Sequence, residues 1–581
     1  MNNYKASSSN IILEKNKELI TNKVEIANTF NTYFSSISHQ PTTNQTVNCS
    51  NHKSFLNSSL PHSFFFLETD SAEIASLINS CSNTFSAGDD DISNYLLKLI
   101  SPNILVPLTH LINLSLNHGS FPSIFKVAKI TPIFKSGSSN DVNNYRPISL
   151  LSTISKILEK IVFNRISAFF EQEKILTPCQ YGFKKNNSTE LALLDLAQYV
   201  SMGIEKRLHT IEVFVDLSKA FDTVDHSILL DKLFHYGIRG LSHNWFKSYL
   251  NDRSQYVSIN NTFSDSISSK IGVPQGSILG PLLFNVYVND MVNISNSAKF
   301  ILFADDTTIL SQDPNFNNLI LKLETQLDFF HNWCLANKLN INHTKTHCIL
   351  FGPKILTNTL HFSLKINHIP IPRVQSVKFL GVMVSSNLSW LEHILYISKK
   401  ISRNLGILNK IKNNFPSFII KLLYNSLIRP YLTYCITLWG NSCKTHITIL
   451  TLSQNYFLRI LFKLKAHDHV SHLYNISHVM TIKQMFQFHT AILFYKLIVK
   501  KISIYHLHLI NSFLNHNTRN LRKIMDFTFK KPRTNFYINS PIVVGLKLWN
   551  LIPINIKHNN NNLNRFKSLV KLMIIDNILT N

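Results

Sequence analysis

The stretch Phe-Ile-Leu-Phe-Ala-Asp-Asp-Thr-Thr-Ile-Leu, residues 300–310, places two adjacent carboxylates, Asp305 and Asp306, between two short apolar runs. Such runs around a polar turn are typical of buried strands, because a helix needs about ten or more residues with a 3.6-residue period. We therefore predict a tight hairpin with both aspartates at its tip. Like charges this close resist ionisation unless divalent cations lie beside them, which suggests a metal-dependent phosphoryl-transfer site. Taken alone, an Asp-Asp pair is more often a solvated turn.

The composition indicates a globular, intracellular protein. The chain has 581 residues, of which 45% are hydrophobic, enough for about three or four domains. No run approaches the roughly 18 uninterrupted apolar residues of a membrane span, and residues 1–10 are too polar for a secretory signal. We therefore expect no membrane partner. The seven cysteines lack Cys-x-x-Cys spacing, which argues against a disulfide framework and a zinc ribbon.

Positive charge is concentrated in the last third of the chain. The formal net charge is +25, and residues 391–581 hold 26 Lys and Arg against 4 Asp and Glu, which gives +22. The first 390 residues hold 32 against 29, which gives only +3. Such a basic region favours a polyanionic partner, most simply nucleic acid. The alternative is a charged, solvated face, because no dense Lys/Arg run is present. Irregularly spaced histidines also permit a zinc knuckle, which we consider the weaker interpretation: His467, His469, His472 and His478, with Cys443.

The N-terminal part shows one helix and one polar segment. Apolar residues at helical spacing from Ile26 to Ile37 predict an amphipathic helix within residues 1–38. Residues 39–62 are rich in Asn, Ser and Thr and predict a flexible linker. The acids of residues 88–91 precede a helical pattern and predict a turn and helix cap in preference to a metal site.

Basic residues alternate with apolar ones between residues 125 and 158, which predicts strands with a positive open face. Arg146 and Lys156, with Lys129 and Lys135 nearby, are suited to cradle a triphosphate, although each alone would be an ordinary surface cation. Residues 180–184 form a glycine turn that exposes aromatic and basic groups, Lys184 among them.

A second acid follows a predicted strand. Residues 210–216 read Thr-Ile-Glu-Val-Phe-Val-Asp, and helical spacing after them places Asp216 at a strand-to-helix junction. Phe221 is either a core aromatic or a platform beneath a bound sugar. Gln275, Gly276 and Ser277 open an apolar helix, where glycine permits close backbone approach and the helix N-terminus favours an anion.

The order of these motifs resembles the reverse transcriptases of non-LTR retrotransposons, most closely the jockey-like elements. The resemblance covers roughly residues 75 to 575, and the nine matching pieces occur in a fixed order. They are residues 144–150 (NYRPISL), 180–183 (QYGF), 214–222 (FVDLSKAFD), 273–284 (VPQGSILGPLLF), 303–306 (FADD), the group Trp333, Asn337, Leu339, Lys345 and Thr346, residues 378–382 (KFLGV), 427–431 with 439–440, and Gly545 with 548–550.

The resemblance implies an α+β, right-hand polymerase. We expect fingers with an N-terminal extension at residues 63–205, a palm with an antiparallel sheet at 206–385, and a helical thumb with a basic C-terminal region at 386–581. Asp216, Asp305 and Asp306 would bind two Mg²⁺ ions, with Mn²⁺ as a substitute, and carry out nucleotidyl transfer. The remaining roles implied by the family are a proton donor at Lys345, triphosphate contacts at Arg146 and Lys156, a steric gate at Phe221, and template and base positioning at Gln275, Gly276 and Ser277.

The family also implies partners and a place of action. An RNA template, a DNA primer and dNTPs would be the substrates, and synthesis at a genomic target would place the protein in the nucleus, with the cytoplasm as the alternative. The chain departs from the family at Lys184, where Arg is common, and lysine cannot make the bidentate contacts of arginine. It also departs at residues 88–91, which read Gly-Asp-Asp-Asp where the family often has Gly-Pro-Asp-Gly. Only about 75 residues precede the polymerase, so we expect endonuclease activity to come from another chain. The alternatives are a non-catalytic nucleic-acid-binding remnant and a nucleotidyl transferase that uses a DNA template or none.

Overall fold

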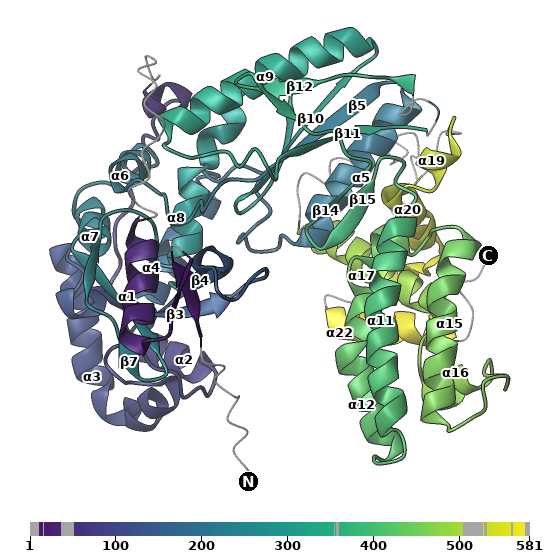
Figure 1. The fold of residues 1–581 in the computed structure, drawn as a ribbon, viewed down its shortest axis with the longest axis horizontal. Helices are drawn as coiled ribbons and strands as arrows, with labels where there is room; N and C mark the ends of the chain where they lie inside the picture. Colours follow the sequence, from purple (N-terminus) through teal and green to yellow (C-terminus); the bar gives the residue numbers. More distant parts are fainter. Residues whose placement is uncertain are drawn as a thin grey trace.

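The computed structural model describes residues 11–15, 17–36, 51–353, 355, 359–502, 510, 527, 532–558 and 562–575 (Figure 1). The N-terminal segments and the C-terminal helices form two lobes, joined by a sheet at the top of the view in Figure 1. This is the expected α+β architecture, with fingers, palm and thumb in that order along the arch.

The palm is a four-stranded antiparallel sheet with strand order β11-β5-β10-β9. Its strands are β5 (His209–Val215), β9 (Lys299–Phe303), β10 (Asp306–Asp313) and β11 (His347–Phe351). Both faces are buried, because Ile211, Val213 and Val215 belong to one hydrophobic cluster and Phe214 to the other. Helix α9 (Phe316–Ala336) packs on the first face and α5 (Thr189–Glu205) on the second. The predicted hairpin and the strand before Asp216 are confirmed.

The fingers combine a second sheet with a helical layer. The sheet has the order β4-β3-β6-β7, with β8 on β6, and its strands are β3 (Val127–Phe134), β4 (Tyr145–Leu150), β6 (Arg253–Ile259), β7 (Thr262–Phe263) and β8 (Ile267–Ser269). The helices of this lobe and of the core that it shares with the palm sheet are α2 (Ser71–Ser80), α3 (Asn94–His118), α4 (Thr153–Gln172), α6 (His226–His235), α7 (Leu241–Leu250) and α8 (Gly280–Tyr287). The short 3-10 helices are η2 (His52–Phe55), η3 (Ser123–Lys126), η4 (Val142–Asn144) and η5 (Asn289–Ile294).

The boundary between fingers and palm differs from the expected one. Strand β6 pairs in parallel with β3, from Val127 opposite Ser254 to Ile130 opposite Val257. Residues 253–269 therefore belong to the fingers sheet, although we expected them in the palm. Helix α5, expected in the fingers, covers the palm sheet instead. In both cases long-range pairing decides the domain of the segment.

The turn before α3 holds the acids of residues 88–91. Ser93 caps α3 by accepting a hydrogen bond from the Leu96 N–H, so the acids are not the cap. Asp90 accepts hydrogen bonds from the Ser152 hydroxyl and the Ile92 N–H. By length and composition, α3 is the one described helix that meets the criteria for a membrane span, and its inner face packs on α2 and α7 in the fingers core.

The N-terminal segment packs on the fingers. The hairpin of β1 (Leu13–Lys15) and β2 (Glu18–Ile20) precedes α1 (Lys23–Ser36), which confirms the predicted helix. Asn31 is fully buried, and its amide donates to the Asp265 carbonyl at 2.7 Å. Residues 37–50 lie outside the described part, but residues 51–62 are not a free linker, because Arg239 donates to the Leu60 carbonyl at 2.5 Å and His52 contacts Asp231 at 3.2 Å.

The thumb is mainly helical, as expected. Its helices are α11 (Leu391–Ile411), α12 (Ser417–Leu427), α13 (Arg429–Thr433), α14 (Ile436–Trp439), α15 (Lys444–Leu461), α16 (Leu473–Ser477), α17 (Ile482–Ile498), α19 (Asn535–Ile538), α20 (Pro541–Leu551), α21 (Ile554–His558) and α22 (Leu563–Ile575). Two small hairpins, β12 (Leu364–Ile366) with β13 (Ile369–Ile371) and β14 (Ser376–Phe379) with β15 (Val382–Ser385), precede them.

Candidate active site

The three predicted acids lie at one end of the palm sheet. Phe303 pairs with Asp306, so Ala304 and Asp305 form the turn between β9 and β10, with Ala304 in the left-handed region at φ 56°. Val215 pairs with Thr307 on the neighbouring strand. Asp216 follows Val215 and therefore emerges beside the tip of the hairpin. Asp305 and Asp306, which follow Asp216 in the chain by 89 and 90 positions, thus lie close to it.

The three acids affect one another's ionisation. Burial raises the pKa of Asp305, and the charge of Asp216 raises that pKa further. The pKa of Asp306 rises to about 6, because burial and the charges of Asp305 and Asp216 all disfavour its ionised form. Three mutually repelling carboxylates at a sheet end are unfavourable without cations.

Asp216 is held by a segment that follows α9. Its Oδ2 accepts a hydrogen bond from Asn342 Nδ2 at 2.9 Å, and its backbone carbonyl accepts from the Asn342 N–H at 2.8 Å. The ammonium of Lys345 lies 3.7 Å from the same Oδ2. The structure therefore brings Lys345 to the acids. Asn342 is a site residue that the sequence analysis missed, because nothing in its own motif marks it.

Two fingers cations reach the acids. Arg146, in β4 opposite Ile133 of β3, lowers the pKa of Asp305 through its charge. Burial lowers the pKa of Lys135, as do the neighbouring cations Arg146 and Lys345, and the charges of Asp216 and Asp305 act in the opposite direction. The fingers sheet thus places positive charge near the carboxylates.

The other two predicted cations are engaged elsewhere. Lys156 lies in the first turn of α4, where its charge acts on Glu159. The Lys184 ammonium donates to the backbone carbonyls of Thr177 at 3.0 Å and Leu176 at 3.4 Å, and burial lowers its pKa. The described contacts do not bring Lys156 or Lys184 to the aspartates.

Phe221 packs on the core with one side of its ring. Its ring stacks on Phe284 of α8, with centroids 4.3 Å apart and planes at 20°, and meets the edge of Phe183 at 6.2 Å. The side chain is half-buried. One part of it therefore belongs to the core, while the rest faces solvent.

Asp222 is a second residue that the sequence analysis left without a role. Gln275 Nε2 donates to both of its oxygens, at 2.8 and 2.9 Å. Burial raises the pKa of Asp222 to about 6, against the opposing effect of the Gln275 hydrogen bonds. The Gln275 carbonyl also accepts from the Ser149 N–H at 2.8 Å, which ties this loop to the fingers.

The loop before α8 is fixed by backbone contacts. Gly276 adopts φ +123°, and a Cβ there would lie 2.6 Å from the Ser149 carbonyl oxygen, so only glycine fits. Ser277 Oγ accepts from the Gly280 N–H at 3.0 Å. Glu159, fully buried in α4, accepts from the Ile278 N–H at 2.7 Å and the Leu279 N–H at 3.2 Å. Glu159 is a third residue that the sequence analysis missed.

The donor set suits hard divalent cations, which carboxylate oxygens bind well. Asp216, Asp305 and Asp306 supply such oxygens, and a bound cation would counteract the raised pKa values of Asp305 and Asp306. Asp216 turns toward Asn342 and Lys345, and among the described residues no three Asp, Glu, His or Cys side chains already close around one point.

An antiparallel sheet that gathers three carboxylates at one end is suited to chemistry that uses two metal ions. Residues 133–384 match the family of reverse transcriptases (RNA-dependent DNA polymerases). This part of the chain is therefore similar to reverse transcriptase domains. The chain as a whole is similar to polymerases of jockey-like non-LTR retrotransposons.

Two curated relatives from Drosophila melanogaster support this assignment. The chain is 27% identical to the probable RNA-directed DNA polymerase from transposon BS, over 72% of this chain and 47% of the relative. It is 28% identical to the RNA-directed DNA polymerase from mobile element jockey, over 69% and 44%. The chain thus spans about half the length of these relatives. A truncated apo telomerase from Candida tropicalis is 14% identical, with a TM-score of 0.32, over 45% of this chain and 54% of that chain. This similarity is too low to support the fold assignment.

Proposed function

We propose that this chain is an RNA-directed DNA polymerase that transfers nucleotides from dNTPs to a DNA primer on an RNA template. The observation that carries this proposal is the strand register, which pairs Val215 with Thr307 and Phe303 with Asp306 and so brings Asp216, Asp305 and Asp306 to one end of the sheet. The match of residues 133–384 to reverse transcriptases supports the template and product classes.

Each residue then has a task that its position supports. Asp216, Asp305 and Asp306 would hold two Mg²⁺ ions, and such ions, when bound, activate a primer hydroxyl and stabilise the leaving oxygens. Arg146 and Lys135 would neutralise the triphosphate. Lys345, which is 60% exposed and lies beside Asp216, is placed to give a proton to the leaving pyrophosphate.

Selection of the nucleotide would fall to the loops that flank the acids. Phe221 stands on Phe284 and would contact the sugar, so that a ribose 2′-hydroxyl clashes with its ring. Gln275 is fixed by Asp222 and Ser149 and would support the incoming base and the template. Lys156 and Lys184 are less suited to the triphosphate, because their contacts lie elsewhere.

Primer extension tests the proposal. We expect the purified protein to extend a DNA primer on RNA with Mg²⁺ and dNTPs, and EDTA to abolish extension. Asp216→Ala should lower the rate by about 10³-fold or more, since a metal ligand contributes several kcal/mol. Asp328→Ala, at an exposed acid on α9 without a described side-chain hydrogen bond, is the matched control and should change nothing.

The competing function is a non-catalytic nucleic-acid-binding remnant, and the engagement of Lys184 with backbone carbonyls is the observation in its favour. A folded protein that binds RNA but extends no primer with Mg²⁺ or Mn²⁺ would support it. Extension on DNA but not on RNA templates would instead indicate a DNA-templated transferase.

A further inference from the structure

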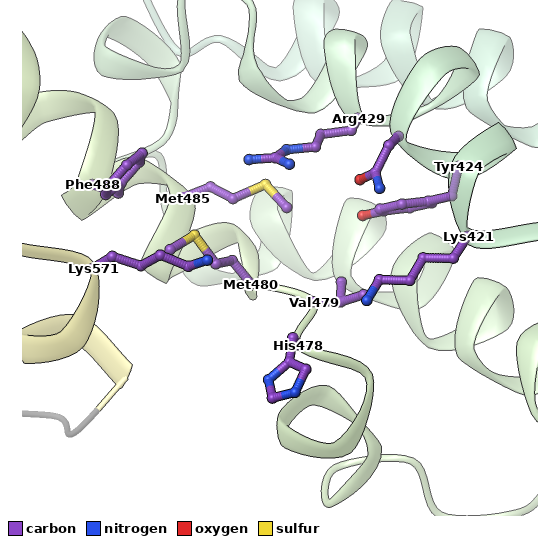
Figure 2. Close-up of a pocket in the computed structure, with 10 residues that line it drawn as sticks. Lys421, Tyr424, Arg429, His478, Val479, Met480, Met485, Phe488 and Lys571 are labelled. Atoms are coloured by element: carbon purple, nitrogen blue, oxygen red, sulfur yellow. The ribbon is translucent and has the colours of Figure 1, made fainter. Parts of the chain in front are cut away.

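A pocket in the thumb lies outside the polymerase site. It has a volume of about 320 Å³ and is lined by α12, the start of α13, the segment before α17, α17 itself and α22. Figure 2 shows Lys421 and Lys571 reaching toward each other from opposite sides, with Arg429 above them and His478 below. Four cationic or titratable side chains from separate elements therefore face one space.

These cations have no described acidic partner. Beyond residue 390, Glu392 and Asp468 are the acids within the described ranges, and neither lines the pocket. No ion pair of Lys421, Arg429 or Lys571 occurs within that part of the chain. The potential here is positive, and it acts on the neighbouring His489, whose pKa falls to about 4 through burial and the charges of Arg429, Lys496 and Lys567. An uncompensated cationic pocket favours an anion.

The rest of the lining is mainly apolar, and hydrogen bonds and stacking hold it in place. Met480, Met485 and Phe488 contribute thioether and aromatic surface. Tyr424 stacks on Phe457 with centroids 3.9 Å apart. Gln454 Nε2 donates to the Tyr424 hydroxyl at 3.0 Å and to the Met480 carbonyl at 3.1 Å, so it joins two walls of the pocket. The pocket thus combines a preformed apolar surface with three strong cations.

From this combination we infer that the pocket binds one unstacked nucleotide of a single-stranded RNA, with the base against Met485 and Phe488 and the phosphate between Lys421, Arg429 and Lys571. Arg and Lys bind the phosphate groups of nucleic acids through charge-assisted hydrogen bonds. The face of any unstacked base can pack on an apolar or aromatic surface. A duplex would not use the apolar wall, because its bases stay stacked. The site is distinct from the polymerase centre and does not depend on catalysis.

Fluorescence anisotropy with a labelled oligouridine tests the charge requirement. The triple variant Lys421→Gln, Arg429→Gln and Lys571→Gln should weaken binding by at least about 10-fold and lower the salt dependence, since each lost phosphate contact removes about one unit of slope. The matched control replaces three exposed thumb lysines outside the pocket, Lys410, Lys444 and Lys483, by Gln. It should weaken binding by less than about 3-fold. Equal losses in the two triples would overturn the proposal.

A second variant changes a single side-chain atom in the pocket and so tests whether RNA binds there. Asn425 lines the pocket and is exposed, so Asn425→Asp places a negative charge there without removing any cation. It should weaken oligouridine binding several-fold, while Asn413→Asp, in the exposed turn after α11, should not. Unchanged thermal midpoints would show that both variants fold. Binding by Asn425→Asp that matches the control would contradict the proposal.

The probe itself tests the nucleotide. An abasic oligonucleotide of the same length, or a blunt RNA duplex, should show a smaller difference between the native protein and the pocket triple than oligouridine does. Free AMP should compete only at millimolar concentration if the nucleotide belongs to a strand. Competition at micromolar AMP, or the same triple-variant effect with abasic and duplex probes, would overturn single-strand recognition. Because every readout is binding, loss of polymerase activity would not imitate any of these results.

Discussion

The side-chain amide of Gln275 spans both carboxylate oxygens of Asp222, with Nε2 2.8 Å from Oδ1 and 2.9 Å from Oδ2. This contact determines which end of the amide points outward, because the NH₂ group is committed to the carboxylate. Gln275 Oε1 therefore remains as the acceptor for a ligand. Asp222 acts through Gln275 and is a positioning residue.

Replacing Asp222 by Asn should release this orientation, because either end of the Gln275 amide can then pair with the new side chain. Hydrogen bonds to charged groups contribute about 1.5–3 kcal/mol, so we expect kcat/KM for dNTPs to fall by about 10–100-fold, mainly through KM. Steady-state primer extension measures this, with Asp328→Asn as the control. A lower thermal midpoint with unchanged KM would show that Asp222 only supports the fold.

Glu212 should make the protein less stable at high pH. It lies fully buried in the middle of β5, and burial raises its pKa well above its usual value of 4.5. The folded chain then retains a proton that the unfolded chain releases above pH 4.5. The free energy of unfolding therefore falls as pH rises, by about 1.4 kcal/mol per pH unit for a single group.

The variant Glu212→Gln removes this proton linkage. At pH 7.5 we expect it to unfold at higher denaturant concentration than the unchanged protein, and at pH 4.5 we expect the two proteins to be equally stable. Urea unfolding at several pH values measures both quantities. A variant that is less stable at every pH would mean that the carboxylate has a partner that stabilises its ionised form.

Local patterns predicted the catalytic end of the palm, whereas long-range contacts did not follow from them. The hairpin around Asp305 and the strand before Asp216 were predictable, because each is a short, mainly apolar segment that ends at a polar residue. Their meeting depends on the pairing of Val215 with Thr307, and we predicted it from the family resemblance and from the chemistry that the acids would share. Asn342 and Glu159 each make two hydrogen bonds with atoms far away in the chain, and no local sequence pattern indicates such contacts.

The wrong assignments have the same origin. Residues 51–62 have a linker composition, yet Arg239 and Asp231, almost 180 positions later, hold them in place. Residues 253–269 were assigned to the palm by position in the chain, but β6 completes the fingers sheet through parallel pairing with β3. Composition indicates only which conformation a segment favours in isolation. The positions of both segments depend on contacts with residues far away in the chain.

The N-terminal helix should support the loop that carries Phe221. Lys219 Nζ donates to the Tyr33 hydroxyl at 2.8 Å and lies 4.5 Å from the Tyr33 ring centroid, while the same hydroxyl donates to Asn143. Tyr33→Phe keeps the ring and loses the hydrogen bonds, so we expect a cost of about 1 kcal/mol. Tyr33→Ala should cost about 3 kcal/mol and raise KM for dNTPs.

Thermal unfolding and primer extension measure these two effects. Tyr95→Phe is the control, because the Tyr95 hydroxyl is without a described hydrogen bond on an exposed part of α3. If Tyr33→Ala is less stable but has an unchanged KM for dNTPs, then α1 stabilises only the fingers sheet and has no effect on the loop of residues 217–222.

The most costly single substitution outside the site should fall on a buried ion pair. Lys232 Nζ lies 2.6 Å from Asp290 Oδ1, and neither side chain is exposed. Lys232 also donates to the Tyr287 carbonyl at 2.5 Å and lies 5.4 Å from the Trp333 ring centroid, so it joins α6, α8 and α9. Lys232→Met leaves the Asp290 charge buried without its cation, for which we expect a loss of about 3–5 kcal/mol in urea unfolding.

The double variant Lys232→Met, Asp290→Leu should recover most of this loss, because two apolar side chains of similar volume remove the unpaired charge. Lys53→Met is the surface control, since the Lys53–Asp231 pair at 3.0 Å is 59% and 43% exposed and should contribute less than about 1 kcal/mol. If the double variant is as unstable as Lys232→Met, the contribution of Lys232 comes from its contacts with Tyr287 and Trp333 and not from the ion pair.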